Sequence, residues 1–343
     1  MPYPTVIKGV GIKQNGGVEV IEELELPFPQ VDPGDMLVKV QYAGVNFYDT
    51  YLRSGLYPTP YFPMPIAREV AGVLVELPTD EAILNSPNFK KRGFKKGGTV
   101  VLDVIGALKE YVSVPWDSMI YPVPDNVPAS VAAASLGQML TTLTQITDAY
   151  NVKEGDTVFV HTIAGGTGLL HAQLAKKRGA IVIGTTSTPQ KAELAKAHGA
   201  DHVILYKEED TVERVSQLTG GKGVDVIYDG VGKDTFDNDF KMIKRRGTIV
   251  SFGNASGKVE PFSLTMLAEK NVRLLRPVYT NWMETVDERD GYAREVYRLV
   301  STGEVKINIY KEHPFTAEGV SQAQLDLVGG KSTGKVLIKV ADC

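Results

Sequence analysis

The sequence TVFVHTIAGGTGLLHAQLAKKRG runs from Thr157 to Gly179 and decides the fold. Its apolar start, Thr157 to His161, predicts a buried strand, and Gly168 to Arg178 predicts a helix that ends at Gly179. Backbone N–H groups at the start of such a helix favour an anion such as a pyrophosphate. A strand, a glycine-rich loop and a helix in this order are typical of a dinucleotide-binding unit.

The glycine-rich loop carries an incomplete form of the G-x-G-x-x-G fingerprint. Ile163 occupies the first glycine position, while Gly165 and Gly168 occupy the other two. A plain tight turn is therefore the alternative to a cofactor site. The residues that we expect to contact the cofactor in this loop are Ala164, Gly165, Gly166, Thr167 and Gly168.

Strands and helices alternate after this loop. The predicted strands are 181–185, 203–205, 224–229 and 248–252, and the predicted helices are 189–198, 211–218 and 235–243. Apolar strands that alternate with helices predict an α/β fold with a doubly wound parallel sheet of the Rossmann type, which we place at residues 130–267. The turn-rich first third predicts a mostly β domain at residues 1–129, and we expect residues 268–343 to pack back on it.

Composition excludes several classes of protein and site. The chain has 343 residues, which suggests about two domains. Its only cysteine is Cys343, so an internal disulfide framework and a cysteine-rich zinc site are excluded. The five histidines show no metal-ligand spacing, and we predict no metal. The formal net charge of −4 gives no general case for nucleic acid or for an anionic membrane.

The chain shows no targeting or membrane signal. The N-terminal residues MPYPTVIKGV lack a basic region followed by an apolar one, as a signal peptide would need. No apolar run approaches the roughly 18 residues that span a bilayer. We therefore expect a cytoplasmic protein without a membrane partner.

The choice of dinucleotide can be argued from the end of the second predicted strand. An NAD-binding site carries Asp or Glu about 20 residues beyond the glycine loop, where it binds the ribose hydroxyls. The segment Gly184 to Lys191 has no carboxylate, so nothing there repels a 2′-phosphate. Ser187 and Lys191 can bind that phosphate, which favours NADPH. The alternative is a helix-capping hydroxyl and a solvated lysine.

Five longer stretches carry a family resemblance. They are GVNFYDTYLRSGLYP (Gly44 to Pro58), AGGTG (Ala164 to Gly168), GKGVDVIYDGVGKDTF (Gly221 to Phe236), RRGTIVSFGNASG (Arg245 to Gly257) and STGKVLI (Ser332 to Ile338). Together they resemble the zeta-crystallin-like quinone oxidoreductases, the zinc-free branch of the medium-chain dehydrogenase/reductase superfamily. The resemblance implies a GroES-like catalytic domain interrupted by a Rossmann domain, NADPH as cofactor, quinones as substrates and a homodimer.

The resemblance also implies roles for single residues. Asn46 and Tyr51 fall on the catalytic positions beside the nicotinamide, and Gly166 and Thr167 on the pyrophosphate contacts. The contacts with the 2′-phosphate and adenosine fall on Ser187, Lys191 and Tyr206, and the loops that flank the nicotinamide on Val231, Phe252, Gly253 and Asn254. Family members often carry an Arg where this chain has Gly330, which makes the adjacent Lys331 a candidate for the phosphate. Zinc-dependent relatives place Cys at position 46 and His at position 68, where this chain has Asn46 and Arg68.

Hydride transfer from a nicotinamide needs no protein nucleophile, so the protein supplies position and electrostatics. Tyr51 or Asn46 can donate a hydrogen bond to the acceptor oxygen as it becomes anionic. The alternatives are a core tyrosine and an asparagine that satisfies a turn.

Two other functions stay open. One is an NADPH-dependent alkene reductase that acts on enones or enoyl groups, with the same hydride donor. The other is RNA binding or a crystallin-type structural role, suggested by the basic run Lys90 to Lys96 at the end of an expected solvated loop that starts near Pro78.

Overall fold

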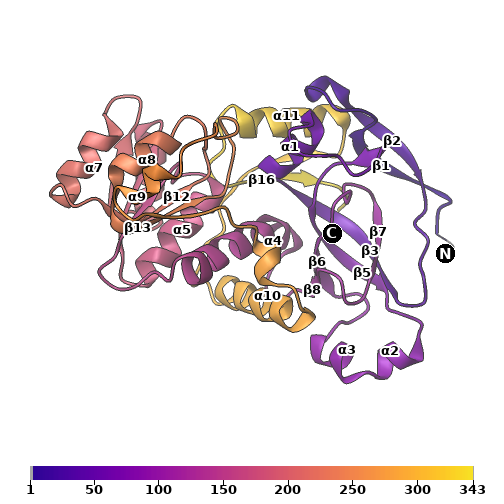
Figure 1. Ribbon diagram of the computed structural model, residues 1–343. Coiled ribbons are helices and arrows are strands. Elements are labelled where there is room, and N and C mark those ends of the chain that lie inside the picture. The colour runs from indigo at the N-terminus through magenta and orange to yellow at the C-terminus, as the bar shows by residue number, and fades with distance from the viewer. Residues whose placement is uncertain (1–2, 343) are drawn as a thin grey trace. The chain divides into compact units, whose positions relative to one another are not determined.

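The computed structural model describes residues 3–342 and shows a chain built from two units (Figure 1). The first unit joins Met1–Gly137 to Thr285–Cys343, and the second is Gln138–Glu284. In the part of the chain that the structure describes, no helix is long and apolar enough to cross a membrane.

The second unit contains a six-stranded, fully parallel sheet in the order β11-β10-β9-β12-β13-β14. Its strands are β9 Thr157–Val160, β10 Ile181–Thr186, β11 His202–Leu205, β12 Val224–Asp229, β13 Ile243–Ser251 and β14 Arg273–Leu275. The helices between them are α5 Gly166–Lys177, α6 Pro189–Ala197, α7 Thr211–Thr219, α8 Phe236–Met242 and α9 Thr265–Ala268. Chain order reverses between β9 and β12, as at the switch point of a Rossmann fold. The predicted fold class is confirmed.

The sixth strand of this sheet, β14, was not predicted from the sequence. β14 pairs in parallel with β13, with Leu274 opposite Ile249. We placed the end of the nucleotide-binding domain at residue 267, before this strand. β14 has only three residues and no turn signal of its own, so its place in the sheet depends on backbone pairing with β13 rather than on a local pattern.

The first unit contains two sheets. A three-stranded sheet has the order β2-β1-β4, and a seven-stranded sheet has the order β15-β16-β3-β5-β6-β8, with β7 paired to β3. The strands are β1 Val6–Ile12, β2 Ile21–Pro27, β3 Asp35–Val45, β4 Met64–Pro65, β5 Glu69–Glu76, β6 Thr99–Asp103, β7 Tyr111–Pro115, β8 Ile120–Pro122, β15 Ile309–Pro314 and β16 Lys335–Lys339. Because β16 pairs antiparallel with β3, the end of the chain completes a sheet built near its beginning.

The helices of the first unit are α1 Phe47–Ser54, α2 Glu81–Asn85, α3 Pro87–Arg92, α10 Val286–Ser301 and α11 Ala317–Val328. Helix α11 packs on strands of both sheets. Helix α4, Ala129–Thr144, continues into the π-helical turn Gln145–Ala149 and crosses the boundary between the units at Gly137. The short 3-10 turns are Val18–Val20 in the first unit and Tyr279–Trp282 in the second.

The solvated loop expected before the basic run is wrong in part, because α2 and α3 form there. Helix α3 begins after Ser86, whose side chain accepts a hydrogen bond from the N–H of Phe89. Arg92 of this run is buried and lies 3.0 Å from the carboxylate of Asp290. Because Arg92 is buried and paired with a carboxylate, it has a structural role and is not available to bind a nucleic acid.

Two lysines of the basic run also have acidic partners. Lys91 lies 2.8 Å from Asp287, and Lys96 lies 2.7 Å from Glu76. The basic run therefore forms ion pairs with acidic residues of the first unit. RNA binding and the homodimer both stay predictions.

Candidate functional site

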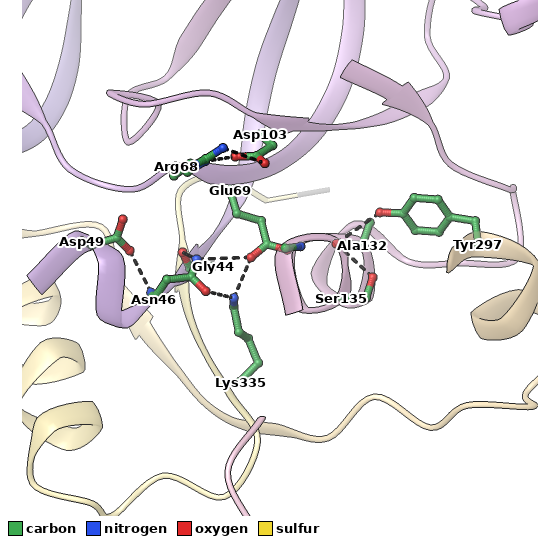
Figure 2. A network of polar contacts seen from close by, with 11 residues as sticks. Gly44, Asn46, Asp49, Arg68, Glu69, Asp103, Ala132, Ser135, Tyr297 and Lys335 are labelled. Carbon is green, nitrogen blue, oxygen red and sulfur yellow. Dashed lines mark hydrogen bonds and ion pairs between the residues drawn. The ribbon is translucent and has the colours of Figure 1, made fainter. Parts of the chain in front are cut away.

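A buried ion pair stands at the centre of a polar network in the first unit (Figure 2). The Nζ of Lys335 lies 2.6 Å from Oε2 of Glu69, and the two side chains are 0% and 2% exposed. Glu69 begins β5 and Lys335 begins β16, and both strands pair with β3. The shared neighbour β3 thus brings together two charges that lie 266 residues apart in the sequence.

The side chain of Asn46 completes this pair. Its Oδ1 accepts a hydrogen bond of 2.7 Å from Lys335, and its Nδ2 donates to Oε2 of Glu69 and to the carbonyl of Gly44, both at 3.3 Å. The other oxygen of Glu69 accepts the backbone N–H of Gly137 at 2.8 Å. Every polar atom of the Asn46 amide therefore has a partner, and its orientation is fixed.

Helix α1 starts from the same asparagine. Asn46 caps the helix, and its backbone N–H donates to Oδ2 of Asp49 at 2.8 Å. Asp49 is 1% exposed, and this burial raises the pKa of its carboxyl to about 7, although the N–H of Asn46 and the charge of Lys335 act in the opposite direction. Burial, not a repelling neighbour, is the main reason why Asp49 holds its proton more tightly than an exposed aspartate.

Tyr51 lies on α1 in a cluster of aromatic rings. Its ring centre is 5.1 Å from that of Tyr57 and 6.2 Å from that of Phe47, and the residue is 9% exposed. The structure thus places Tyr51 five residues beyond Asn46, on the same helix and against two aromatic rings. Its catalytic role stays a prediction.

The predicted pyrophosphate loop forms the start of α5 in the second unit. Gly165 is the N-cap, and as a glycine it has no side chain with which to cap the helix. A Cβ added to Gly168 would lie 2.5 Å from the carbonyl oxygen of Thr162, and one added to Gly166 would lie 2.3 Å from Nε2 of Gln138. Gly168 therefore needs glycine, because its neighbour is backbone, whereas the end of the Gln138 side chain beside Gly166 can move away. Ala164 beside them is buried. An open helix start of this kind suits a pyrophosphate.

The predicted phosphate contacts meet at the ends of two neighbouring strands. Ser187 directly follows β10 and Tyr206 directly follows β11, and the N–H of Tyr206 donates to the carbonyl of Thr186 at 3.2 Å. Lys191 lies in the first turn of α6. Partial burial, and next the positive charge of Lys207, lower the pKa of Lys191. Lys207 is therefore a second cation at this place, and it is not among the residues predicted from the sequence.

The two loops predicted beside the nicotinamide are joined by backbone hydrogen bonds. The N–H of Phe252 donates to the carbonyl of Asp229 at 2.7 Å, at the ends of β13 and β12. A Cβ on Gly253 would lie 2.1 Å from the carbonyl oxygen of Gly230, so this close approach requires glycine. The structure thus brings Val231 together with Phe252, Gly253 and Asn254, of which Asn254 is buried.

Comparison with known proteins assigns the chain to a family. The model of the alcohol dehydrogenase GroES-like domain matches residues 32–125, and that of the zinc-binding dehydrogenases matches residues 166–290. A probable quinone oxidoreductase of Schizosaccharomyces pombe is 35% identical over 332 residues and matches 96% of each chain. The chain belongs to the quinone oxidoreductases.

Two further relatives are named for different substrates. A crystal structure of Escherichia coli quinone oxidoreductase complexed with NADPH has a TM-score of 0.89 at 32% identity, and covers 97% of this chain and 100% of its own. A 2-haloacrylate reductase from a Burkholderia species is 31% identical over 335 residues, 94% of this chain and 95% of the relative. Quinone oxidoreductases therefore have relatives of the same length that are named for a different acceptor.

Membership in a superfamily of zinc-binding dehydrogenases requires a test of the zinc site. Asn46, at the position of a zinc-binding Cys, is held by Lys335 and Glu69. Arg68, at the position of a zinc-binding His, forms a two-bond ion pair with Asp103 (Figure 2). The ammonium of Lys335 beside Asn46 and the guanidinium of Arg68 would repel a divalent cation, and neither group is a zinc ligand. The residues present do not fit zinc.

Lys331 lies in the first unit, whereas Ser187, Lys191 and Tyr206 lie in the second. It is exposed, and its Nζ is 3.9 Å from Oδ1 of Asp326. Its contact with a 2′-phosphate stays a prediction.

Proposed function

We propose that this quinone oxidoreductase reduces quinones with NADPH and without a metal. The observation that carries the proposal is the group of Ser187, Lys191 and Lys207 at the ends of β10 and β11, where an NAD-binding site carries an acidic side chain. Two cations and a hydroxyl favour the 2′-phosphate of NADPH. The E. coli relative complexed with NADPH supports the same cofactor.

The second unit supplies the residues that would hold NADPH. The start of α5, from Gly165 to Thr167, would bind the pyrophosphate, and the joined loops at Val231 and at Phe252 to Asn254 would bind the nicotinamide end. Bound NADPH supplies the hydride, so no nucleophile is required of the protein. The open helix start and the close glycine contacts fit such a ligand.

Two residues of the first unit are assigned separate tasks in this proposal. The quinone oxygen becomes anionic as it is reduced and needs a hydrogen-bond donor. Asn46 uses its Nδ2 group on Glu69 and Gly44, so we assign it a positioning role. We assign the donor role to the hydroxyl of Tyr51, which lies on the helix that Asn46 caps.

Tyr51→Phe is expected to lower kcat by about tenfold to a hundredfold, because a lost donor to a developing oxyanion costs up to a few kcal/mol. The KM for NADPH is expected to stay unchanged. Steady-state kinetics with a para-quinone measure both. Tyr57→Phe is the matched control, since Tyr57 packs against Tyr51 in the same cluster. If the two variants had equal kinetics, the hydroxyl of Tyr51 would have no catalytic role, and Tyr51 would be a core residue only.

An acceptor panel tests the whole proposal. Purified protein is expected to oxidise NADPH faster than NADH with ortho- and para-quinones, measured by loss of nicotinamide absorbance. Fluorescence titration measures NADPH binding without an acceptor. If no NADPH binding is detected, the proposal is wrong.

A second candidate is the reduction of a conjugated C=C bond. It is favoured by the 31% identity to the Burkholderia 2-haloacrylate reductase, which its name places among enzymes that act on such a bond. The same panel separates the two functions when it includes an enone and an acrylate. Faster turnover of these than of any quinone would favour the alkene reductase.

A further inference from the structure

Three titratable side chains form a buried cluster in the second unit, outside the contacts assigned to the cofactor. His161 follows β9, Asp229 ends β12 and Asp239 lies in α8. One ring nitrogen and one oxygen from each carboxylate all lie within 4.8 Å of one another, and no member is more than 5% exposed. His161 immediately precedes the glycine-rich loop, and Asp229 immediately precedes the loop that contains Val231.

In each of the two carboxylates, one oxygen accepts hydrogen bonds and the other accepts none from the described residues. Oδ1 of Asp229 accepts the N–H groups of Val231 and Gly232 at 2.7 and 3.1 Å and the hydroxyl of Thr235 at 3.0 Å. Oδ1 of Asp239 is 2.8 Å from Nε2 of His161. The Oδ2 atoms of both residues are buried, and neither has a hydrogen-bond donor among the described residues.

Ionised carboxylates are acceptors only, so two such oxygens in one buried cluster cannot satisfy each other without a proton. We propose that Asp229 and Asp239 share one proton between their Oδ2 atoms, and that this acid pair holds the loop 230–235 in place. We place the proton on Asp239, because Oδ1 of Asp239 has one partner, His161, whereas Oδ1 of Asp229 accepts three donors. Asp239 then donates to Asp229 and accepts from His161.

A divalent cation is the competing occupant of this cluster, and the donor set fits it less well. Oδ1 of Asp229 is engaged by three donors, and Oδ1 of Asp239 is engaged by His161. Two oxygens remain, whereas a structural zinc site takes four ligands. A single proton satisfies both oxygens and displaces no existing hydrogen bond.

The cluster makes the stability of the second unit depend on pH. Burial raises the pKa of Asp239 to about 6, and Asp229 adds to the increase while His161 opposes it. His161, which follows β9, and Asp229, at the end of β12, are the titratable groups that act on this carboxyl. Since the folded pKa lies above the ordinary value of 3.8, the stabilisation is complete below about pH 4 and is lost as the pH rises through about 6.

The consequence for the cofactor rests on the proposed function, whereas the shared proton does not. Loss of the proton places two negative charges side by side in a buried setting. Repulsion then weakens the hold of Asp229 on the N–H groups of Val231 and Gly232. We expect NADPH to bind less tightly above the pKa of the pair than below it.

Asp239→Asn tests the proposal, because its amide reproduces the protonated carboxyl. The Nδ2 group can donate to Asp229 while Oδ1 still accepts from His161. Asp239→Leu is the matched control, since leucine has the same branched shape and no donor. In urea unfolding, the midpoint of the wild-type protein is expected to fall between about pH 4 and about pH 7, and to fall by more than that of Asp239→Asn over the same range. Asp239→Leu is expected to have a lower midpoint than Asp239→Asn at every pH.

A spectroscopic measurement keeps the proposal separate from cofactor binding. Infrared difference spectra between the wild-type protein and Asp239→Asn are expected to show a protonated carboxyl that titrates near pH 6, above the ordinary range of aspartate. The absence of this signal, together with equal destabilisation by Asn and Leu, would overturn the proposal. Stoichiometric Zn²⁺ binding that Asp239→Asn abolishes would overturn it as well. None of these readouts uses NADPH, so a failure of the proposed function leaves them unaffected.

Discussion

Lys335→Met is expected to lower the free energy of unfolding by about 3–5 kcal/mol, because it leaves the charge of Glu69 buried without its partner. The two side chains are 0% and 2% exposed and 2.6 Å apart, so water cannot replace the lost ammonium. Oδ1 of Asn46 loses the same donor. Urea unfolding measures the change, and a drop in kcat is expected with it because Asn46 is no longer fixed.

Lys339→Met is the matched control for this prediction. Lys339 lies on the same strand, β16, but its ion pair with Asp342 is exposed, so its loss is expected to change stability little. The double variant Lys335→Met with Glu69→Gln removes both charges and keeps an oxygen for the N–H of Gly137. It is expected to recover a large part of the lost stability. A single variant as stable as the control would show that Glu69 does not need Lys335.

Five of the six strands of the parallel sheet could be predicted, because their signals are local. The helix predicted at 189–198 is α6 at Pro189–Ala197, with proline at its start and glycine after its end. The strand predicted at 224–229 is β12 with the same bounds. In both segments hydrophobic periodicity and turn residues give the same answer, and tertiary packing agrees with them.

The polar networks could not be predicted, because they depend on contacts between distant parts of the chain. Glu69 and Lys335 are each the first residue of an apolar strand, and a charged residue at that position indicates only that the strand begins there. Only the pairing of β5 and β16 with β3 shows that both charges are buried. Asp239 likewise reads as a polar residue on a surface helix, and its burial against His161 follows from the packing of α8.

The cofactor residues lie between these two cases. Ser187 and Lys191 could be found from the missing acidic residue, since the end of the second strand of a Rossmann fold has a known chemical task. Lys207 was not predicted, because its relation to Lys191 depends on the pairing of β10 with β11. A lysine that directly follows Tyr206 in a predicted phosphate site is the signal that could have identified it.

Lys191→Ala is expected to raise the KM for NADPH by about tenfold to a hundredfold and to leave the KM for NADH nearly unchanged. The reason is that a hydrogen bond to a charged group contributes about 1.5–3 kcal/mol, and each 1.4 kcal/mol is a factor of about ten in affinity. Lys191 is suited to this task because partial burial and Lys207 already lower its pKa, so an added dianion relieves the repulsion between the two lysines. Steady-state kinetics with each cofactor measure the split.

A control for the difference between the two KM values is a lysine on the same helix. Lys196 lies on α6 with its Nζ 2.9 Å from Glu193, so Lys196→Ala changes the net charge equally without touching the strand ends. Lys207→Ala is expected to show the NADPH-specific effect in weaker form, and the effect of each lysine should shrink as salt screens the phosphate. If Lys191→Ala raised both KM values alike, the lysine would hold the loop rather than bind the phosphate, and the choice of NADPH would have to come from elsewhere in the chain.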